Sequence, residues 1–423
     1  MQDTIVQGTK VVQAAENGHF ILRAGTVFSG TEKQAVKCRD IEIENGRIKN
    51  IDKFGAFDEL NLPLADYSDC FIMPGLIEAH IHLSGMKTPD AYKRYFEPRD
   101  LRVLRAARHA ETLLSIGYTS VRDLGGNSVA VAIREAAQLG MLHAPSITTS
   151  IEYLSPTGGH GDWPSIPLET VKALQMRSML VDGPDECVRA IRQLSREKAD
   201  FVKIVVSSGS MGQPYEQMQF KNNFSMAELY AMVDEAHDEG KMIASHTVGG
   251  NGVRRALEAG IDSLEHCFFN YDREPELLDE IVKKGTYVCP TLSIIRWQGE
   301  NEEKKGNIEK AKSFYKNVEH HGRFAKAAFE AGVPLACGTD ETGTRGTGRC
   351  PEEYGYWAAA GIPNYGILWG CTSTAARVVG IEKQTGSLQA GKKADILVLK
   401  SNPLDDISVL QNKENIVCVI QGK

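Results

Sequence analysis

The feature that most restricts the fold of this chain is an alternation of short apolar segments with amphipathic segments over residues 73–379. A capping-box pattern, S-x-x-E from Ser225 to Glu228, opens one amphipathic segment, and apolar residues then recur at helical spacing. Eight strand candidates follow one another in this region: residues 72–84, 118–123, 146–152, 201–206, 242–246, 261–266, 286–291 and 333–339. Eight strand–helix units favour an α/β protein with a (β/α)8 TIM barrel. A doubly wound open sheet is the alternative, but no Gly-x-Gly-x-x-Gly follows an early strand.

The two ends of the chain have a different, β-rich pattern. Residues 40–48 alternate strictly between polar and apolar and contain Asn45-Gly46, the strongest short hairpin signal. Residues 386–399 and 417–420 are similar in character. We therefore expect a small β-sandwich whose strands pair across the whole length of the chain. The expected division is residues 1–72 and 380–423 for the sandwich and residues 73–379 for the catalytic barrel.

Charge and composition exclude several classes of partner. The net charge of −7 over 423 residues argues against nucleic acid or an anionic membrane surface. No apolar run approaches the roughly 20 residues that are needed to cross a bilayer. No basic segment followed by an apolar one is visible near Met1, and the nine cysteines are odd in number and scattered. These features predict a cytoplasmic protein with reduced thiols and a small-molecule substrate.

Histidines and an aspartate mark the ends of several predicted strands. His80 and His82 are two residues apart, so both imidazoles point to one face of a strand. His246 and His266 end the fifth and sixth strands, and Asp340 follows the eighth. Because the chemistry of a TIM barrel lies where its strands end, we expect these five side chains to meet. Neutral imidazoles on one face make half of a metal site, whereas His80 and His82 alone could equally be satisfied by backbone carbonyls.

Lys203 interrupts the apolar run of the fourth predicted strand, residues 201–206. A buried ammonium ion there would cost several kcal/mol. One explanation is a lysine that reaches the barrel mouth or pairs with a carboxylate. Beside four histidines and an aspartate, a second explanation is favoured. A deprotonated amine reacts with carbon dioxide to give a carbamate, which is an anion able to bridge two metal ions.

Several motifs resemble the amidohydrolase superfamily. They are P-G-L-I-E-A-H-I-H, V-K-I-V-V-S-S-G, S-L-E-H and G-T-D in the barrel region, and G-S-L-Q-A-G-K-K-A-D-I-L-V-L and N-P-L-D-D-I near the C-terminal end. The likeness covers nearly the whole chain. T-G-G-H-G-D and D-E-A-H-D-E-G are similar to the branch with imidazolonepropionase-like proteins, metal-dependent Xaa-Pro dipeptidases (prolidases) and ochratoxin-hydrolysing amidases.

The resemblance implies a site with two divalent metal ions, most often Zn²⁺. His80, His82 and Asp340 would hold the buried ion. His246 and His266 would hold the more exposed ion, with N6-carboxylysine at position 203 between the two. A hydroxide that bridges the ions would attack the substrate carbonyl, and catalytic Asp340 would carry the proton to the leaving nitrogen. Relatives are commonly homo-oligomers.

Other loop residues near the predicted site are more ambiguous. His160 lies in a Gly-rich turn, where relatives place a histidine that contacts the substrate, although a solvent-facing loop histidine is the alternative. Arg345 and Arg349 lie in a Gly-rich loop after the eighth strand that is a candidate lid. Either could meet a substrate carboxylate, but loop arginines are more commonly solvated.

One position departs from the dipeptidase pattern. Many dipeptidase relatives carry a tyrosine two residues after the histidine of the fifth strand, and Val248 occupies that position here. This departure weakens the dipeptidase assignment and favours an amidase that acts on a bulky or aromatic N-acyl group. We expect hydrolysis of an amide C–N bond in a small substrate, such as an Xaa-Pro dipeptide, an N-acyl amino acid or an aromatic amide like ochratoxin A. The alternatives are cyclic-amide hydrolysis of the imidazolonepropionase kind and a non-catalytic assembly protein with a retained barrel.

Overall fold

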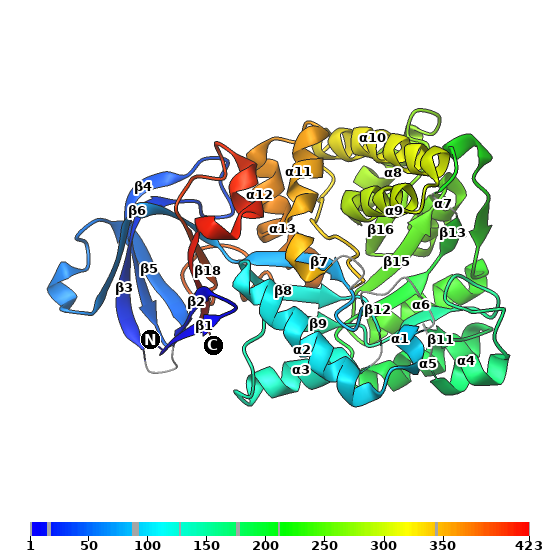
Figure 1. The fold of residues 1–423 in the computed structure, drawn as a ribbon, viewed down its shortest axis with the longest axis horizontal. Helices are drawn as coiled ribbons and strands as arrows, with labels where there is room; N and C mark the ends of the chain where they lie inside the picture. The colour runs from blue at the N-terminus through cyan, green and yellow to red at the C-terminus, as the bar shows by residue number, and fades with distance from the viewer. Residues whose placement is uncertain are drawn as a thin grey trace.

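The computed structural model describes residues 2–14, 18–86, 93–126, 128–174, 178–209, 212–342 and 346–422. It has a β-rich part, which contains both chain ends, and a larger part in which helices surround parallel strands (Figure 1). No helix in the described part of the chain combines the length and apolar character that a membrane crossing requires.

The β-rich part is built on one eight-stranded sheet with strands from both ends of the chain. In spatial order the strands are β1 (Gln2–Val6), β2 (Thr9–Ala14), β19 (Ile416–Gly422), β18 (Ile396–Leu399), β6 (Leu64–Pro74), β3 (His19–Val27), β4 (Val36–Glu44) and β5 (Arg47–Lys53). β19 pairs in parallel with β2, and β18 pairs antiparallel with β6. The two ends of the chain therefore complete one sheet, as their shared β-rich pattern predicts.

A tight hairpin joins β4 and β5. Glu44 pairs with Arg47, so Asn45 and Gly46 are the two loop residues. Their φ angles are 53° and 73°, the left-handed values of a type I′ turn, which Asn-Gly adopts at little cost. The hairpin signal in the sequence predicted this turn correctly.

The larger part has parallel strands in two ladders. One ladder has the order β11 (Met179–Leu180), β10 (Tyr153–Ser155), β12 (Val202–Val205), β15 (Ile243–Val248), β16 (Ser263–Phe268) and β17 (Tyr287–Cys289). The other consists of β7 (Leu76–Ile81), β8 (Tyr118–Asp123) and β9 (Ser146–Thr149). A separate antiparallel hairpin pairs β13 (Ser207–Gly209) with β14 (Phe220–Asn222).

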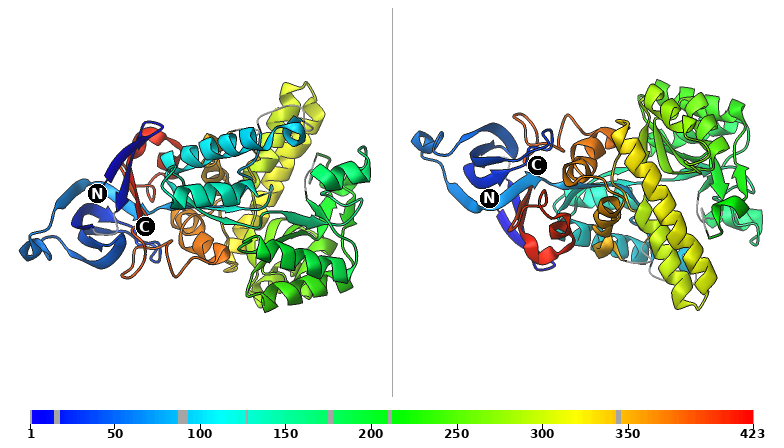
Figure 2. Two further views of the ribbon diagram at one scale, coloured as in Figure 1. Left: turned by 90° about the horizontal axis from the view of Figure 1, so that it is seen from below. Right: turned by 90° about the horizontal axis from the view of Figure 1, so that it is seen from above.

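Helices alternate with these strands, and the long helix α10 runs along one side of the larger part (Figure 2). The helices are α1 (Lys93–Phe96), α2 (Arg99–Ser115), α3 (Val129–Gln138), α4 (Leu168–Leu174), α5 (Pro184–Arg196), α6 (Met226–Asp238), α7 (Gly250–Ala259), α8 (Glu276–Lys284), α9 (Leu292–Lys304), α10 (Ile308–Glu330), α11 (Glu352–Ala359), α12 (Asn364–Gly370) and α13 (Ser373–Val379). Ser225 caps α6 through both hydrogen bonds of a capping box with Glu228, as the sequence predicts.

The segment predicted as the eighth strand, residues 333–339, lies between the two ladders without forming a regular strand of its own. Its Ala336 N–H donates to the carbonyl of Val288 at 2.9 Å, and its Cys337 carbonyl accepts from Ala79 N–H at 3.0 Å. Gly338 allows this close approach, because a Cβ there would lie 2.6 Å from the backbone nitrogen of His80. This segment therefore contacts β17 on one side and β7 on the other.

The predicted third strand, residues 146–152, is interrupted. β9 ends at Thr149, β10 begins at Tyr153, and Ile151 between them has a left-handed φ of 64°. β9 pairs with β8 whereas β10 pairs with β12, and the strand pairing of the described residues forms two ladders and not one continuous ring. The α/β class with parallel strands is confirmed at this level.

The shared sheet makes a prediction about stability. Ile420 on β19 is 1% exposed in the apolar cluster of the β-rich part, whereas Ile5 on β1 of the same sheet is 68% exposed. Ile420→Ala should lower the free energy of unfolding by about 2–5 kcal/mol, because it leaves a cavity. Ile5→Ala, the matched control, should change it by less than about 0.5 kcal/mol. Urea unfolding of both variants checks this, and equal losses would contradict it.

Candidate active site

The six side chains predicted as metal ligands lie together where the parallel strands end. His80 is on β7 and His82 follows it, Lys203 is on β12, His246 is on β15, His266 is on β16, and Asp340 follows the segment between the ladders. The ring centres of His80 lie 5.7 Å from His82 and 5.2 Å from His266, and those of His246 and His266 are 4.5 Å apart. The structure thus brings together residues that are up to 260 positions apart in the chain.

Asp340 is the carboxylate at the centre of this group. One of its oxygens, Oδ1, lies 3.4 Å from Nε2 of His80 and 3.2 Å from Nε2 of His82. Burial opposes ionisation, but the neighbouring imidazoles hold the pKa of Asp340 well below its usual value. Ligand atoms of His80, His266 and Asp340 all lie within 4.8 Å of one another, a spacing that suits one metal ion.

In three of the histidines, a polar contact of Nδ1 fixes the orientation of the ring. His80 Nδ1 lies 2.7 Å from a carboxylate oxygen of Glu265, and His82 Nδ1 lies 2.6 Å from the carbonyl oxygen of Gly125. His266 Nδ1 lies 2.7 Å from the hydroxyl of Thr291. A carbonyl and a carboxylate only accept, so Nδ1 of His80 and His82 carries a proton, and Nε2 of each ring faces Asp340.

His246 and His160 form the other side of the site. Their rings stack with centres 4.3 Å apart and planes inclined by 24°. Burial, and then the neighbouring basic groups, lower the pKa of His246 well below its usual value, so it is neutral and able to bind a metal. His160 donates its backbone N–H to Asn223 Oδ1 at 3.2 Å. His160 thus lies beside the predicted metal ligand His246, and its contact with substrate stays a prediction.

Lys203 is buried, and its Nζ makes no hydrogen bond within the described residues. Burial lowers the pKa of this amine to about 8. A buried ammonium without a hydrogen-bond partner is unfavourable even with the carboxylates of Glu265 and Asp340 nearby, whereas a lysine converted to a carbamate would supply an anion to metal ions. The imidazoles, Asp340 and this unpartnered amine therefore fit a site for divalent metals.

Glu265, which is fully buried beside the site, was not among the predicted site residues. Side chains alternate along a regular strand, so Glu265 and His266 should face opposite sides. Left-handed φ angles of 66° at His266 and 50° at Cys267, next to a shift in register opposite Thr247, turn His266 toward the site as well. The missed signal was a carboxylate inside an apolar strand, which is rarely buried without a partner.

The structure gives a different result for each remaining residue of the sequence analysis, namely Arg349, Arg345 and Val248. Arg349 donates to Glu352 at 2.6 Å and lies 3.4 Å from Glu300, so it already has carboxylate partners. Arg345 lies outside the described residues. Val248, at the position where the dipeptidase pattern predicts a tyrosine, is fully buried in an apolar cluster with Phe268 and Trp297.

Comparison with known proteins places this fold among metal-dependent hydrolases. A Xaa-Pro dipeptidase structure with methionine bound in its active site is 27% identical, with a TM-score of 0.80 over 96% of this chain and 98% of that one. The structure of Aspergillus niger ochratoxinase aligns with a TM-score of 0.82 at 25% identity, over 95% of this chain and 94% of that one.

The sequence comparisons agree with the structural ones. Ochratoxinase of Aspergillus niger is 30% identical over 370 residues, which are 83% of this chain and 74% of that protein. The model of the amidohydrolase family matches residues 71–422. The chain belongs to the amidohydrolase family, which confirms the suspected superfamily and branch.

The buried amine of Lys203 should lower the stability of the metal-free protein, and this effect can be measured. In metal-free protein at pH 7, Lys203→Met should raise the free energy of unfolding by up to about 3 kcal/mol, because burial lowers the pKa of the amine from 10.5 to about 8. The folded state holds the proton less tightly than the unfolded state, so the gain is full below pH 8 and disappears as the pH rises toward 10.5.

Urea unfolding of chelator-treated protein at pH 7 and at pH 10 measures this difference. Lys400→Met, on an exposed residue, is the control and should change stability by less than about 0.5 kcal/mol at either pH. A Lys203→Met variant that is less stable than the parent at pH 7 would contradict the prediction.

Proposed function

We propose that this protein is a binuclear metal-dependent amidohydrolase that cleaves an amide C–N bond in a small substrate. The observation that supports the proposal most is the convergence of four histidines, Asp340 and a buried unpartnered Lys203 on one edge of parallel strands. We also infer that the two ladders and residues 333–341 form one closed (β/α)8 barrel around this edge.

Each residue has a role in this proposal. His80, His82 and Asp340 would hold one ion, His246 and His266 the other, and N6-carboxylated Lys203 would lie between them. When bound, divalent ions such as Zn²⁺ supply Lewis acidity, which lowers the pKa of a water molecule and polarises an amide carbonyl. Asp340 accepts the proton of the attacking water and delivers it to the leaving nitrogen. His160 contacts the substrate from its position against His246.

The substrate class rests on one departure from the dipeptidase pattern and on the likeness to ochratoxinase. Val248, two residues beyond His246, carries no hydroxyl where that pattern has a tyrosine, which weakens the dipeptidase assignment. Ochratoxinase is 30% identical over 370 residues, which favours an amide with a bulky aromatic group. We therefore rank N-acyl amino acids and aromatic amides of the ochratoxin A kind first, and Xaa-Pro dipeptides second. Zinc as the metal, a homo-oligomeric assembly and a cytoplasmic location stay predictions from the sequence.

Metal removal tests the proposal directly. Purified protein should contain about two zinc-like ions per chain and release amine from an N-acyl aromatic amino acid. Chelator treatment should abolish this activity, and added Zn²⁺ should restore it. Chromatography of the products from a panel with an Xaa-Pro dipeptide and a cyclic amide distinguishes the substrate classes. Carefully purified protein that lacks metal and leaves the whole panel intact would support the assembly-protein alternative.

Asp340 should contribute more to the reaction than to metal retention. Asp340→Asn keeps an oxygen near His80 and His82 but cannot accept a proton, so kcat should fall by about 10²- to 10⁴-fold while most of the metal stays bound. Elemental analysis and initial rates on the same preparation measure the two effects. The exposed carboxylate variant Glu239→Gln is the control and should match the parent. A near-normal rate for Asp340→Asn would assign the proton transfer to another group.

A further inference from the structure

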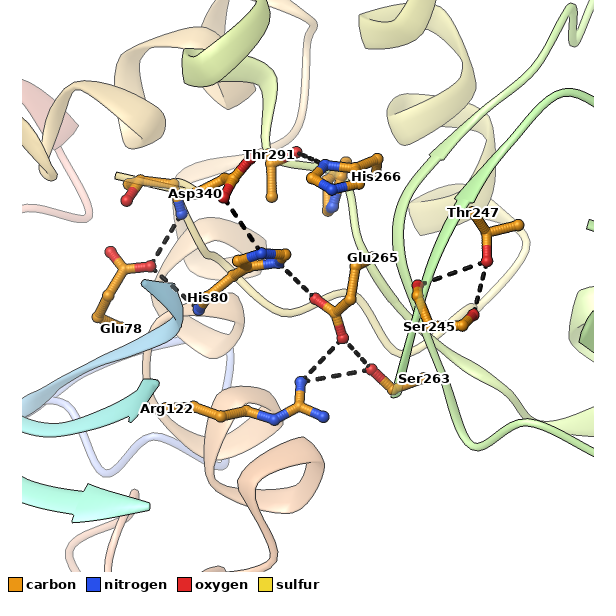
Figure 3. Close-up of polar contacts among 12 residues, drawn as sticks. Glu78, His80, Arg122, Ser245, Thr247, Ser263, Glu265, His266, Thr291 and Asp340 are labelled. Carbon is orange, nitrogen blue, oxygen red and sulfur yellow. Dashed lines mark hydrogen bonds and ion pairs between the residues drawn. The ribbon is translucent and has the colours of Figure 1, made fainter. Parts of the chain in front are cut away.

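Glu265 lies between a site histidine and a buried arginine (Figure 3). Its Oε2 accepts from His80 Nδ1 at 2.7 Å, and its Oε1 accepts from Nη1 of Arg122 at 2.9 Å. The hydroxyl of Ser263 donates to the same Oε1. The side chains of Glu265 and Arg122 are both 0% exposed, so water does not weaken this ion pair.

Arg122 has no second carboxylate partner within the described residues, and its guanidinium lies 4.5 Å from the ring centre of Phe201. A buried guanidinium at 2.9 Å keeps the Glu265 carboxylate as an anion. The anion in turn accepts a hydrogen bond from His80 Nδ1, which orients the ring so that its Nε2 faces Asp340. The chain Arg122–Glu265–His80 thus ends at one of the two proposed metal positions.

The corresponding contacts of two other site histidines are uncharged. His82 Nδ1 contacts the carbonyl of Gly125, and His266 Nδ1 contacts the hydroxyl of Thr291. A carboxylate partner raises the basicity of a metal-binding imidazole more than a neutral oxygen does. Of these three histidines, His80 is therefore the strongest ligand for a metal ion. Glu265 also places a negative charge near the ion that His80 would hold.

We infer that Glu265, fixed by Arg122, is a positioning residue that makes the two metal positions unequal. The position of His80, His82 and Asp340 fills first and empties last, and the position of His246 and His266 exchanges its ion more readily. This inference rests on the proposed binuclear function and assigns a role to two residues outside the predicted ligand set. The competing explanation is purely structural, namely a buried ion pair that holds β8 against β16.

Zinc binding without substrate separates the two explanations. Chelator-stripped protein is titrated with Zn²⁺ against a chromogenic chelator, and the parent should bind two ions in two steps. Glu265→Gln should weaken the tighter step by about 10- to 100-fold and change the weaker step by less than about 3-fold. Thr291→Val, the matched control at His266, should affect the weaker step instead.

Glu265→Gln leaves the guanidinium of Arg122 buried without an anion, so the single variant risks misfolding. The double variant Arg122→Met/Glu265→Gln removes both charges and keeps an oxygen able to accept from His80. It should recover the thermal midpoint while the tighter zinc step stays weakened. That combination separates the charge effect on the metal from any loss of fold.

The outcomes distinguish this inference from the proposed function. If the double variant restores parental zinc binding, or if both steps weaken equally, Glu265 has only a structural role and the inference is wrong. A parent protein that binds no zinc overturns the proposed function and this inference together. Two unequal steps in the parent that Glu265→Gln leaves unchanged overturn the inference alone.

Discussion

Side chains alternate between two faces along a regular strand, and this constraint decides which residues of the chain can enter the site. In the register of β12, β15 and β16, Val205 lies beside His246 and His246 lies beside Glu265. Opposed residues of parallel strands point to the same side, and Lys203 is two residues before Val205. Lys203, His246 and Glu265 therefore enter the interior by ordinary strand geometry, whereas His266 does not.

His266 enters because the backbone leaves the strand conformation at that point. A left-handed backbone at His266 is unfavourable by itself. The hydrogen bond between its Nδ1 and the hydroxyl of Thr291 offsets part of this strain. Thr291 is itself left-handed, with φ of 50°, and begins the turn into α9. The carboxylate of Glu353 accepts the next two backbone N–H groups, of Leu292 at 2.9 Å and Ser293 at 2.7 Å, and so fixes that turn.

The sequence predicted the parts of the fold and site that depend on local pattern. Asn45-Gly46 specified a turn by its own conformational preference. Lys203 was selected because an ammonium ion buried in an apolar strand is unfavourable unless it is paired or neutralised. Glu265 was missed because the alternation rule assigns it the face opposite His266, and only a left-handed backbone at His266 reverses that assignment. The break at residues 150–152 was missed for the same reason, since an isoleucine carries no signal for a left-handed φ.

Four left-handed residues lie at or beside the strand ends that form the site. His266, Cys267, Thr291 and Asp340 all have left-handed φ angles, although none is glycine and Thr291 is β-branched. Each such residue costs on the order of 1–3 kcal/mol unless its surroundings fix it. The surroundings here are buried hydrogen bonds from His266 to Thr291 and from Asp340 N–H to the carbonyl of His80 at 2.8 Å. The left-handed residues at the strand ends therefore lower the stability of the fold, and they direct His266 and Asp340 toward the candidate site. That cost is consistent with a chemical role for the site, because packing alone would be better satisfied by regular strands.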